Sequence, residues 1–193
     1  MKKTIFGLFT LSVILFSCKK DSGGDNNNTT TSYMSLTAGQ TRTYETTDNI
    51  AMSASSNTST STNRDTSINA RTYHVFSNSD GSSGYFNVTG NDYYSFTSLP
   101  SLSNLQLELL YLKANLNVNG SWTQNTNVTV PGLPFPLAVT ITNTIEEKGI
   151  SRTTGTMSHT AVIKVRTGIS VAGLPASALS TNIQAYYAPR YGQ

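Results

Sequence analysis

The chain has 193 residues, with 13 Lys or Arg against 10 Asp or Glu, and charged residues make up only 12% of it. Because the numbers of basic and acidic residues are nearly equal, the chain has no basic surface for nucleic acid, and we expect no nucleic-acid partner. Thr, Ser and Asn together account for 72 residues, a composition that competes with helix formation and suits half-exposed strands. The composition predicts a β-rich, exported protein.

The first residues read as an export signal. Lys2 and Lys3 precede an apolar run over residues 5–16, which is shorter than the about 20 residues that span a bilayer. The run ends in Leu15-Phe16-Ser17-Cys18, which resembles the lipobox of bacterial lipoproteins, apart from the bulky Phe16. The alternatives are an ordinary signal peptide with a chance cysteine, or a short amphipathic start of a soluble protein.

Cys18 is the only cysteine of the chain, so it has no intramolecular disulfide partner. Fatty acylation, such as by palmitate, would explain a lone cysteine at this position. We therefore predict a signal peptide over residues 1–17 and an acylated Cys18 that anchors the protein to the outer membrane, on its periplasmic or its outer face. Residues 18–35, the acylated cysteine and a run rich in Asp, Asn, Gly and Thr, are expected to form a flexible polar tether. Residues 36–193 then make a single β-rich domain.

Within residues 36–193 the sequence predicts strands separated by turns. Residues 53–69 are rich in Ser, Thr and Asn, and are expected to form a long hairpin loop or a polar edge strand. Residues 71–76, 85–89 and 93–97 are expected strands, joined by turns that contain Gly and Asn. Residues 105–112 fit both a helix and a strand by their leucine spacing, and the flanking composition favours a strand.

The C-terminal half alternates between apolar and polar residues. Ala161, Ile163 and Val165 share one predicted face, while Lys164 and Arg166 share the other. One buried, apolar face and one solvent-exposed, polar face are typical of an antiparallel sheet. The fold class predicted is all-β: an antiparallel, curved sheet or an incomplete barrel or sandwich, with little helix beyond the signal segment.

Two loops share a Val-x-Gly-Leu-Pro pattern, at residues 130–134 and 171–175. Their leucines, Leu133 and Leu174, either pack onto the sheet or form apolar loop tips that contact a ligand or partner, together with Phe135. Trp122 is a further candidate contact, because an aromatic ring can stack on a sugar or a lipid. The simpler interpretation of the aromatic residues is that they form cross-strand pairs.

Catalytic and metal-binding patterns are scarce. There is no nucleophile elbow, phosphate loop, dinucleotide fingerprint or Cys/His metal spacing. The histidines, His74 and His159, are both expected in strands, and the adjacent Glu146 and Glu147 should point to opposite faces unless the backbone bulges. We expect no enzyme activity, no metal and no cofactor.

Two further segments resemble a group of exported Bacteroidetes-type lipoproteins. They are Leu109-Leu110-Tyr111-Leu112-Lys113 followed by Gly120-Ser121-Trp122-Thr123, and Ala185-Tyr186-Tyr187-Ala188-Pro189-Arg190-Tyr191-Gly192. The resemblance implies that the Gly-x-Trp segment opens a strand and that the Tyr-Tyr-Ala segment leads into the last strand. Arg190-Tyr191-Gly192 departs from the Gly-Val-Gly form of that group, so a last strand is expected to be missing or very short.

Three functions remain from the sequence. The first is a lipid-anchored, non-enzymatic binding module of the cell envelope for an apolar or glycan ligand. The second is a structural or adhesive envelope protein, and the third is a hydrolase, which would need carboxylates or a cluster of His74 with a serine in a cleft. The sequence predicts no oligomeric state.

Overall fold

The structure is a computed structural model that describes residues 32–48, 53–99, 105–129, 134–173 and 183–191. The chain divides into the units Met1–Thr30 and Thr31–Gln193, and every described residue belongs to the second unit. The predicted signal peptide, Cys18 and all but the last residues of the tether therefore lie outside the described residues.

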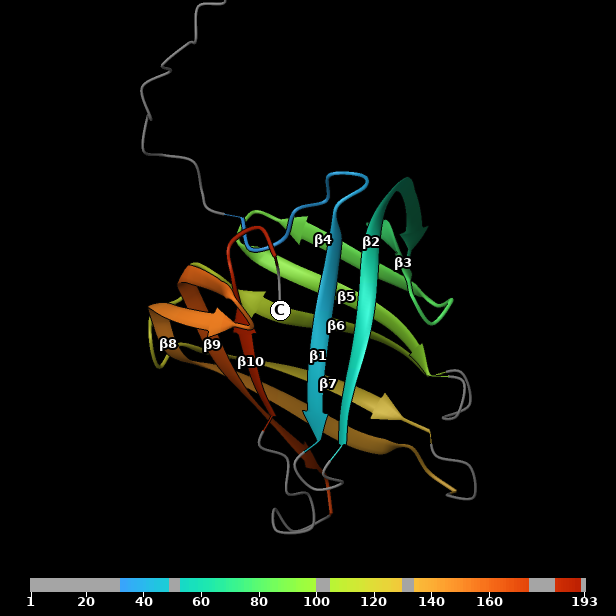
Figure 1. The fold of residues 1–193 in the computed structure, drawn as a ribbon. Coiled ribbons are helices and arrows are strands. Elements are labelled where there is room, and N and C mark those ends of the chain that lie inside the picture. The colour runs from blue at the N-terminus through green and yellow to red at the C-terminus, as the bar shows by residue number, and fades with distance from the viewer. Residues whose placement is uncertain (1–31, 49–52, 100–104, 130–133, 174–182, 192–193) are drawn as a thin grey trace, which may run out of the picture. The chain divides into compact units, whose positions relative to one another are not determined.

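The described residues form two antiparallel sheets in which every strand pairs with its neighbour in the sequence (Figure 1). The six-stranded sheet holds β1 (Thr41–Asp48), β2 (Ser53–Ile68), β3 (Arg71–Asn78), β4 (Ser83–Thr89), β5 (Asp92–Leu99) and β6 (Leu105–Lys113). The four-stranded sheet holds β7 (Ser121–Val128), β8 (Leu137–Thr154), β9 (Met157–Val171) and β10 (Ile183–Tyr187). The first sheet is strongly curled into a half-barrel, and the all-β prediction is confirmed. Within the described ranges there is no helix with the length and apolar character needed to cross a membrane.

Tight turns set the register of the six-stranded sheet. Asn69 and Ala70, which join β2 to β3, both have positive φ angles, 50° and 64°, as a two-residue hairpin turn of the type I′ class requires. In the next turn, Asp80 accepts a hydrogen bond from the Ser82 amide at 2.9 Å, while Gly81 takes a φ of 84°. The predicted strands at residues 71–76, 85–89, 93–97 and 105–112 all fall within observed strands, and Ser121 opens β7 as the Gly-x-Trp segment implies.

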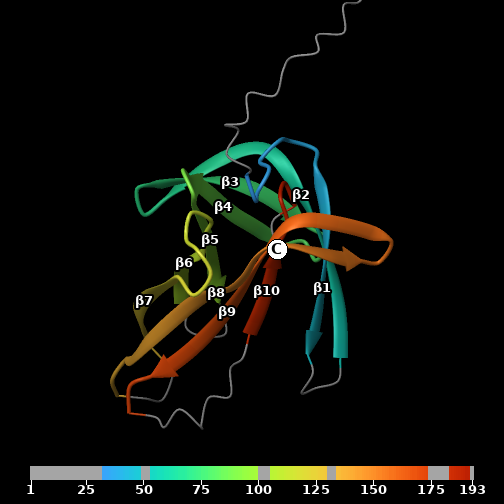
Figure 2. The same cartoon turned by 90° about the vertical axis from the view of Figure 1, so that its left-hand side faces the viewer.

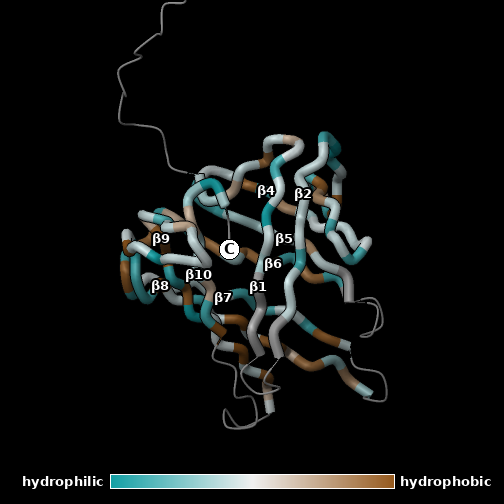
Figure 3. Tube along the Cα trace, viewed as in Figure 1, coloured by the Kyte–Doolittle hydropathy of each residue, from teal (hydrophilic) through white to brown (hydrophobic). Residues whose placement is uncertain are grey.

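Neither prediction for residues 53–69 is right. These residues form β2, which pairs with β1 on one side and β3 on the other, so β2 is neither a loop nor an edge strand. Figure 3 shows why the sequence misled: β1 and β2 are mostly neutral to hydrophilic in colour, without the brown residues that mark strands such as β6. Thr is β-branched, and its hydroxyls pair across the strands, as in Thr41 with Thr60 and Thr43 with Thr58, each at 3.2 Å.

The hydrophobic core draws on both sheets. Its fully buried members include Phe76, Tyr93, Leu112, Ile145 and Ile163. Burying a side chain of this size contributes about 1.5–3 kcal/mol. This cluster has members from both sheets and therefore holds them against each other. Figure 2 shows the strands of both sheets in a view turned by 90°.

Side chains, rather than a backbone ladder, join β6 to β7. The indole Nε1–H of Trp122 donates to the Leu110 carbonyl at 2.7 Å, and Gln124 Oε1 accepts from the Leu110 amide at 2.8 Å. Gln124 Nε2 also donates to the Glu108 carbonyl at 3.4 Å. Two edge strands are thus capped by side chains, which satisfies backbone groups that would otherwise be open to another chain.

The folded domain begins earlier than the sequence predicts. Tyr33 and Met34, which fall within the tether predicted for residues 18–35, are buried in the core. Met34 forms an isolated antiparallel bridge with Tyr191, and the Arg190 amide donates to the Ser32 carbonyl at 2.8 Å. The segment after β10 thus pairs with the segment before β1.

Backbone irregularities in β8 and β9 correct two details of the predicted faces. Ala161 has a φ of 56° and is exposed, while Val162 and Ile163 are both buried, so the simple alternation predicted through Ala161 is wrong. A register shift lies between Ile145 and Glu147. Through it, the carboxylates of Glu146 and Glu147 both reach Lys164, each at 3.1 Å, which neighbours on a regular strand would not do.

Candidate functional site

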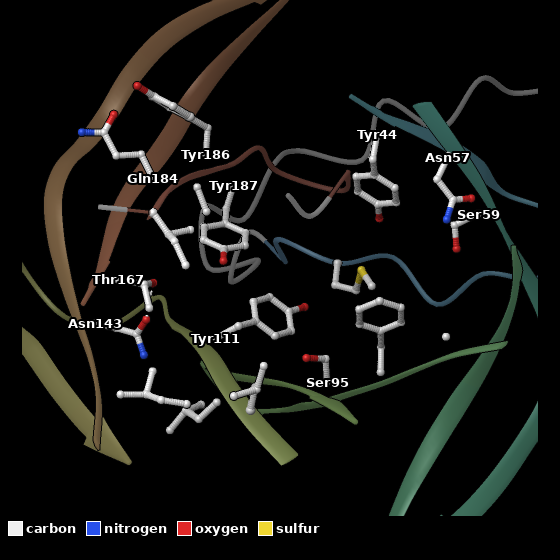
Figure 4. Close-up of a pocket in the computed structure, with 18 of the residues that line it drawn as sticks. Tyr44, Asn57, Ser59, Ser95, Tyr111, Asn143, Thr167, Gln184, Tyr186 and Tyr187 are labelled. Atoms are coloured by element: carbon white, nitrogen blue, oxygen red, sulfur yellow. Dashed lines mark hydrogen bonds between the residues drawn. The ribbon is translucent and has the colours of Figure 1, made fainter. Parts of the chain in front are cut away.

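A cavity of about 840 Å³ lies between the two sheets. Figure 4 shows its labelled wall residues, which come from both sheets: Tyr44, Asn57, Ser59, Ser95 and Tyr111 from the six-stranded sheet, and Asn143, Thr167, Gln184, Tyr186 and Tyr187 from the four-stranded sheet. Ligand pockets in proteins commonly enclose about 300–1,000 Å³. The curl of the six-stranded sheet creates this space, because a flat sheet would pack directly on its neighbour.

Apolar side chains make up much of the cavity wall. They include Met34, Phe86, Leu107, Leu109, Ile141 and Ile183. Leu107 and Leu109 occupy alternate positions on β6 and so share one face, and Tyr111 joins them in the wall at a register shift of the same strand. The wall offers a ligand a surface from which water is favourably displaced.

Hydroxyl groups are set into this apolar wall. In Figure 4 the hydroxyls of Tyr44, Tyr111 and Ser95 point toward the middle of the cavity. The Tyr111 hydroxyl makes no hydrogen bond with any residue that the structure describes. Burial, and then the nearby phenols of Tyr187 and Tyr44, raise the pKa of Tyr111 well above 10.0, so it stays a neutral donor at ordinary pH. A ligand with a hydrogen-bond acceptor would find an unengaged donor here.

The ring of Tyr111 is held in place by stacking. It lies nearly parallel to the ring of Tyr187 on β10, with the centroids 5.4 Å apart and an angle of 29° between the planes. Burial also raises the pKa of Tyr187. The pair therefore brings two neutral phenols from the two sheets into one wall.

An amide adds a further polar position. Asn143 on β8 is buried, and its Oδ1 accepts a hydrogen bond from Thr167 Oγ1 at 2.6 Å. This bond fixes the amide orientation and leaves the Nδ2 donor without a partner among the described residues. Beside the cavity on β2, the buried Ser59 Oγ also has no hydrogen-bond partner within the described part of the chain.

A smaller chamber of about 290 Å³ adjoins the main cavity. The two spaces share wall residues on β1, β8 and β10: Thr43, Tyr44, Arg152, Thr154 and Tyr186. The chamber lies where β1 approaches β9 and β10. We call the larger space the main cavity and the smaller one the side chamber.

Of the contact residues predicted from the sequence, the two that the structure describes, Trp122 and Phe135, line neither space. Trp122 is buried at 8% exposure and takes part in the joint between β6 and β7. Phe135 is 59% exposed, and it lines neither the main cavity nor the side chamber. Leu133 and Leu174 lie outside the described residues, as does Cys18. Contact of these residues with a ligand or partner stays a prediction.

A chain of polar side chains on β2 and β3 has the order of a hydrolase triad. Ser61 Oγ lies 2.9 Å from His74 Nε2, and His74 Nδ1 lies 2.7 Å from Asp65 Oδ1. However, Ser61 is only 2% exposed, and its hydroxyl also donates to the Leu36 carbonyl at 3.1 Å. None of the three residues lines either space. In this conformation the hydroxyl is bound to backbone and covered.

The same serine anchors the segment that precedes β1. The Ser61 amide donates to the Gln40 carbonyl, and the Ser61 carbonyl accepts from the Gly39 amide, both at 2.8 Å. The hydrogen-bonded series of Asp65, His74 and Ser61 thus holds residues 36–40 on the sheet. This structural role accounts for all of the hydrogen bonds in the series.

No protein-family model, curated protein or solved structure matches this chain. Function is therefore argued from the geometry of the main cavity, the side chamber and the polar chain on β2 and β3.

Sequence reasoning missed most of the cavity wall. The alternation of Leu107, Leu109 and Tyr111 was the available signal, since it places these residues on one face of a strand. Asn143 and Tyr44 carried no such signal, because a single Asn or Tyr in a polar strand is an ordinary surface residue.

Proposed function

We propose that the protein is a non-enzymatic binding module of the cell envelope that takes an apolar ligand into the main cavity and is anchored through an acylated Cys18. The observation that carries the binding role is the main cavity itself, with about 840 Å³ between walls to which both sheets contribute apolar side chains. A structural or adhesive protein has no need for such a space, because a well-packed interior is more stable than a hollow one.

The wall favours an apolar ligand over a glycan. A sugar would need aromatic faces open for stacking together with dense hydrogen-bonding partners. Tyr111 and Tyr187 instead stack on each other, and the face of the Tyr186 ring is covered by Arg152, whose Cζ lies 3.5 Å from the ring centroid. The free phenol of Tyr111 suits a ligand with an acceptor at one position and hydrocarbon elsewhere.

The anchor rests on the residues around Cys18. Two lysines precede a short apolar segment that ends at the only cysteine, and two more, Lys19 and Lys20, follow it. A lipid attached at Cys18 would hold the domain near a membrane, where an apolar ligand is available. The anchor and the cavity then serve one purpose, the capture or handover of a lipid-like molecule.

Native mass spectrometry tests the binding role directly. The protein is purified from its own host with its lipid anchor removed, and its mass is measured under non-denaturing conditions. A mass increase that disappears on denaturation, and that organic extraction identifies as a lipid-like compound, would support the proposal. A consistently empty protein that also fails to take up the neutral dye Nile red would overturn it.

A serine hydrolase is the second candidate, favoured by the order and distances of Ser61, His74 and Asp65. Reaction of the hydroxyl would require the segment at Leu36 to move away. A fluorophosphonate probe tests this: labelling that Ser61→Ala abolishes and Ser59→Ala retains would establish the hydrolase. Absence of labelling, with the protein folded, would exclude it.

A further inference from the structure

Arg42 on β1 is a buried cation without a carboxylate partner among the residues that the structure describes. Its side chain is 6% exposed, and its guanidinium donates from Nη1 to Met34 Sδ at 2.9 Å and from Nη2 to the Ser35 carbonyl. Its carbon Cζ also lies 4.9 Å from the centroid of the Phe76 ring. All of these contacts are neutral, and no ion pair joins Arg42 to a described residue.

This arrangement is unusual for a buried charge. Buried arginines are almost always paired, because an isolated charge loses its hydration without compensation. Elsewhere the chain follows this rule: Lys164, which is half-buried, pairs with both Glu146 and Glu147, and Arg166 pairs with Glu146 at 2.9 Å. An anion placed beside Arg42 would therefore supply the charge partner that no described residue provides.

The side chamber supplies the space for that anion. Its wall includes Arg42, Arg152 and His159, and it includes no Asp or Glu among the described residues. The described wall of the main cavity contains no carboxylate either. Arg152, exposed and over the Tyr186 ring, forms no ion pair with a described residue. Arg42 and Arg152 thus both border one small chamber whose described wall supplies no negative charge.

We propose that the ligand is a single-chain amphipathic anion, with its carboxylate in the side chamber against Arg42 and Arg152 and its hydrocarbon chain in the main cavity. This inference rests on the proposed binding function and specifies its ligand class. The two spaces share Thr43, Tyr44 and Tyr186, so one molecule is able to occupy both.

The chemistry of each compartment matches one end of such a molecule. A guanidinium presents several N–H donors in a planar fork, which fits the two oxygens of a carboxylate. Tyr44 stands on the wall that the two spaces share, so it would lie beside the junction of head group and hydrocarbon chain. The main cavity then receives the chain along Leu107, Leu109 and Ile141. An alcohol with the same chain would fill the main cavity equally well but leave Arg42 unpaired.

A matched pair of probes separates the head-group interaction from hydrophobic binding. Lauric acid and dodecanol are titrated calorimetrically, each below its solubility limit and at a pH where lauric acid is ionised. The protein is the full chain with Cys18→Ser, which leaves every residue of both spaces unchanged. The wild-type cavity should bind lauric acid about 10- to 100-fold more tightly than dodecanol, as charge-assisted hydrogen bonds contribute.

Three variants complete the test. Arg42→Gln should remove most of the preference for lauric acid and leave dodecanol binding unchanged, whereas Arg42→Lys should retain part of it. Arg152→Gln, at an exposed position that tolerates substitution, gives a second measurement of the same preference if Arg42→Gln does not fold. Arg64→Gln, which removes an exposed charge of β2 that borders neither space, should change nothing.

The outcomes are distinguishable. Equal loss of both probes in Arg42→Gln, with the preference intact in Arg152→Gln, would show that Arg42 is structural and would overturn the inference. Equal binding of both probes by the wild-type cavity would also overturn it while leaving the proposed function intact. Binding of neither probe would overturn both.

Discussion

The indole nitrogen of Trp122 lies 2.7 Å from the carbonyl oxygen of Leu110, and this hydrogen bond joins the two sheets across the gap between β6 and β7. Both residues belong to strands that end their sheets. The contact therefore takes the place of a strand pairing.

Replacement of Trp122 by Phe keeps an aromatic ring but removes the donor. We expect the free energy of unfolding to fall by about 1–3 kcal/mol, because the Leu110 carbonyl then loses its partner in a partly buried site. Urea unfolding followed by circular dichroism measures the change. Tyr85→Phe, at a half-buried ring on β4, serves as an aromatic control. An unchanged midpoint in Trp122→Phe would mean that water satisfies the Leu110 carbonyl equally well.

Ser59 and Ser61 on β2 offer a comparison of two buried hydroxyls on one face. Ser61→Ala should lower the free energy of unfolding by about 1–3 kcal/mol, because His74 and the Leu36 carbonyl both lose a partner. Ser59→Ala should change it by less than about 0.5 kcal/mol, or raise it, because no described residue bonds its hydroxyl. Thermal and urea unfolding of both variants give the answer. Equal losses would show that the Ser59 hydroxyl has a partner such as ordered water.

Stability should fall in alkali because of the buried tyrosines. Burial raises the pKa of Tyr111 and Tyr187 above the value of 10.0 that applies in the unfolded chain. Above pH about 10 the unfolded chain releases these protons while the folded chain keeps them, so unfolding becomes progressively more favourable. Each tyrosine contributes a slope of about 1.4 kcal/mol per pH unit in that range. The stabilisation is fully present below pH 10.

Tyr187→Phe isolates one of these contributions. Its free energy of unfolding, measured in urea between pH 8 and about 11, should decline less steeply than that of the wild type. Tyr85→Phe, at a half-buried ring on β4, controls for the removal of a tyrosine hydroxyl as such. An identical decline in Tyr187→Phe and wild type would show that Tyr187 ionises normally.

Cys18→Ser tests the proposed anchor. In its own host the wild-type protein should fractionate with membranes and incorporate labelled fatty acid. The variant should lose the label and appear in the soluble envelope fraction, since stable membrane attachment then has no acyl chain. Ser17→Ala, one residue earlier, controls for disturbance of the signal segment. Continued labelling of Cys18→Ser would contradict the anchor.

The sequence predicted the fold better than it predicted the candidate site. Turn residues and alternation were enough to predict β3 to β6, since both signals are local. The place of β2 inside the sheet was missed, because its Ser, Thr and Asn residues give no apolar face and its two pairings depend on partners on both sides. The contacts among Ser61, His74 and Asp65 depend on a register shift between Ser61 and Asp65, which no local pattern announces. Likewise, the lack of an ion-pair partner for Arg42 among the described residues depends on which side chains distant segments bring close to it, and no local pattern shows this.

The bridge between Met34 and Tyr191 has a consequence for how the protein is made. Within each sheet, strands that follow one another in the sequence pair, so successive hairpins are able to form as the ribosome releases them. Tyr33 and Met34, however, complete the core beside Tyr187, a partner made more than a hundred residues later. Until the ribosome has released β10 and Tyr191, the core therefore lacks partners of Tyr33 and Met34, and its packing is completed only after that point.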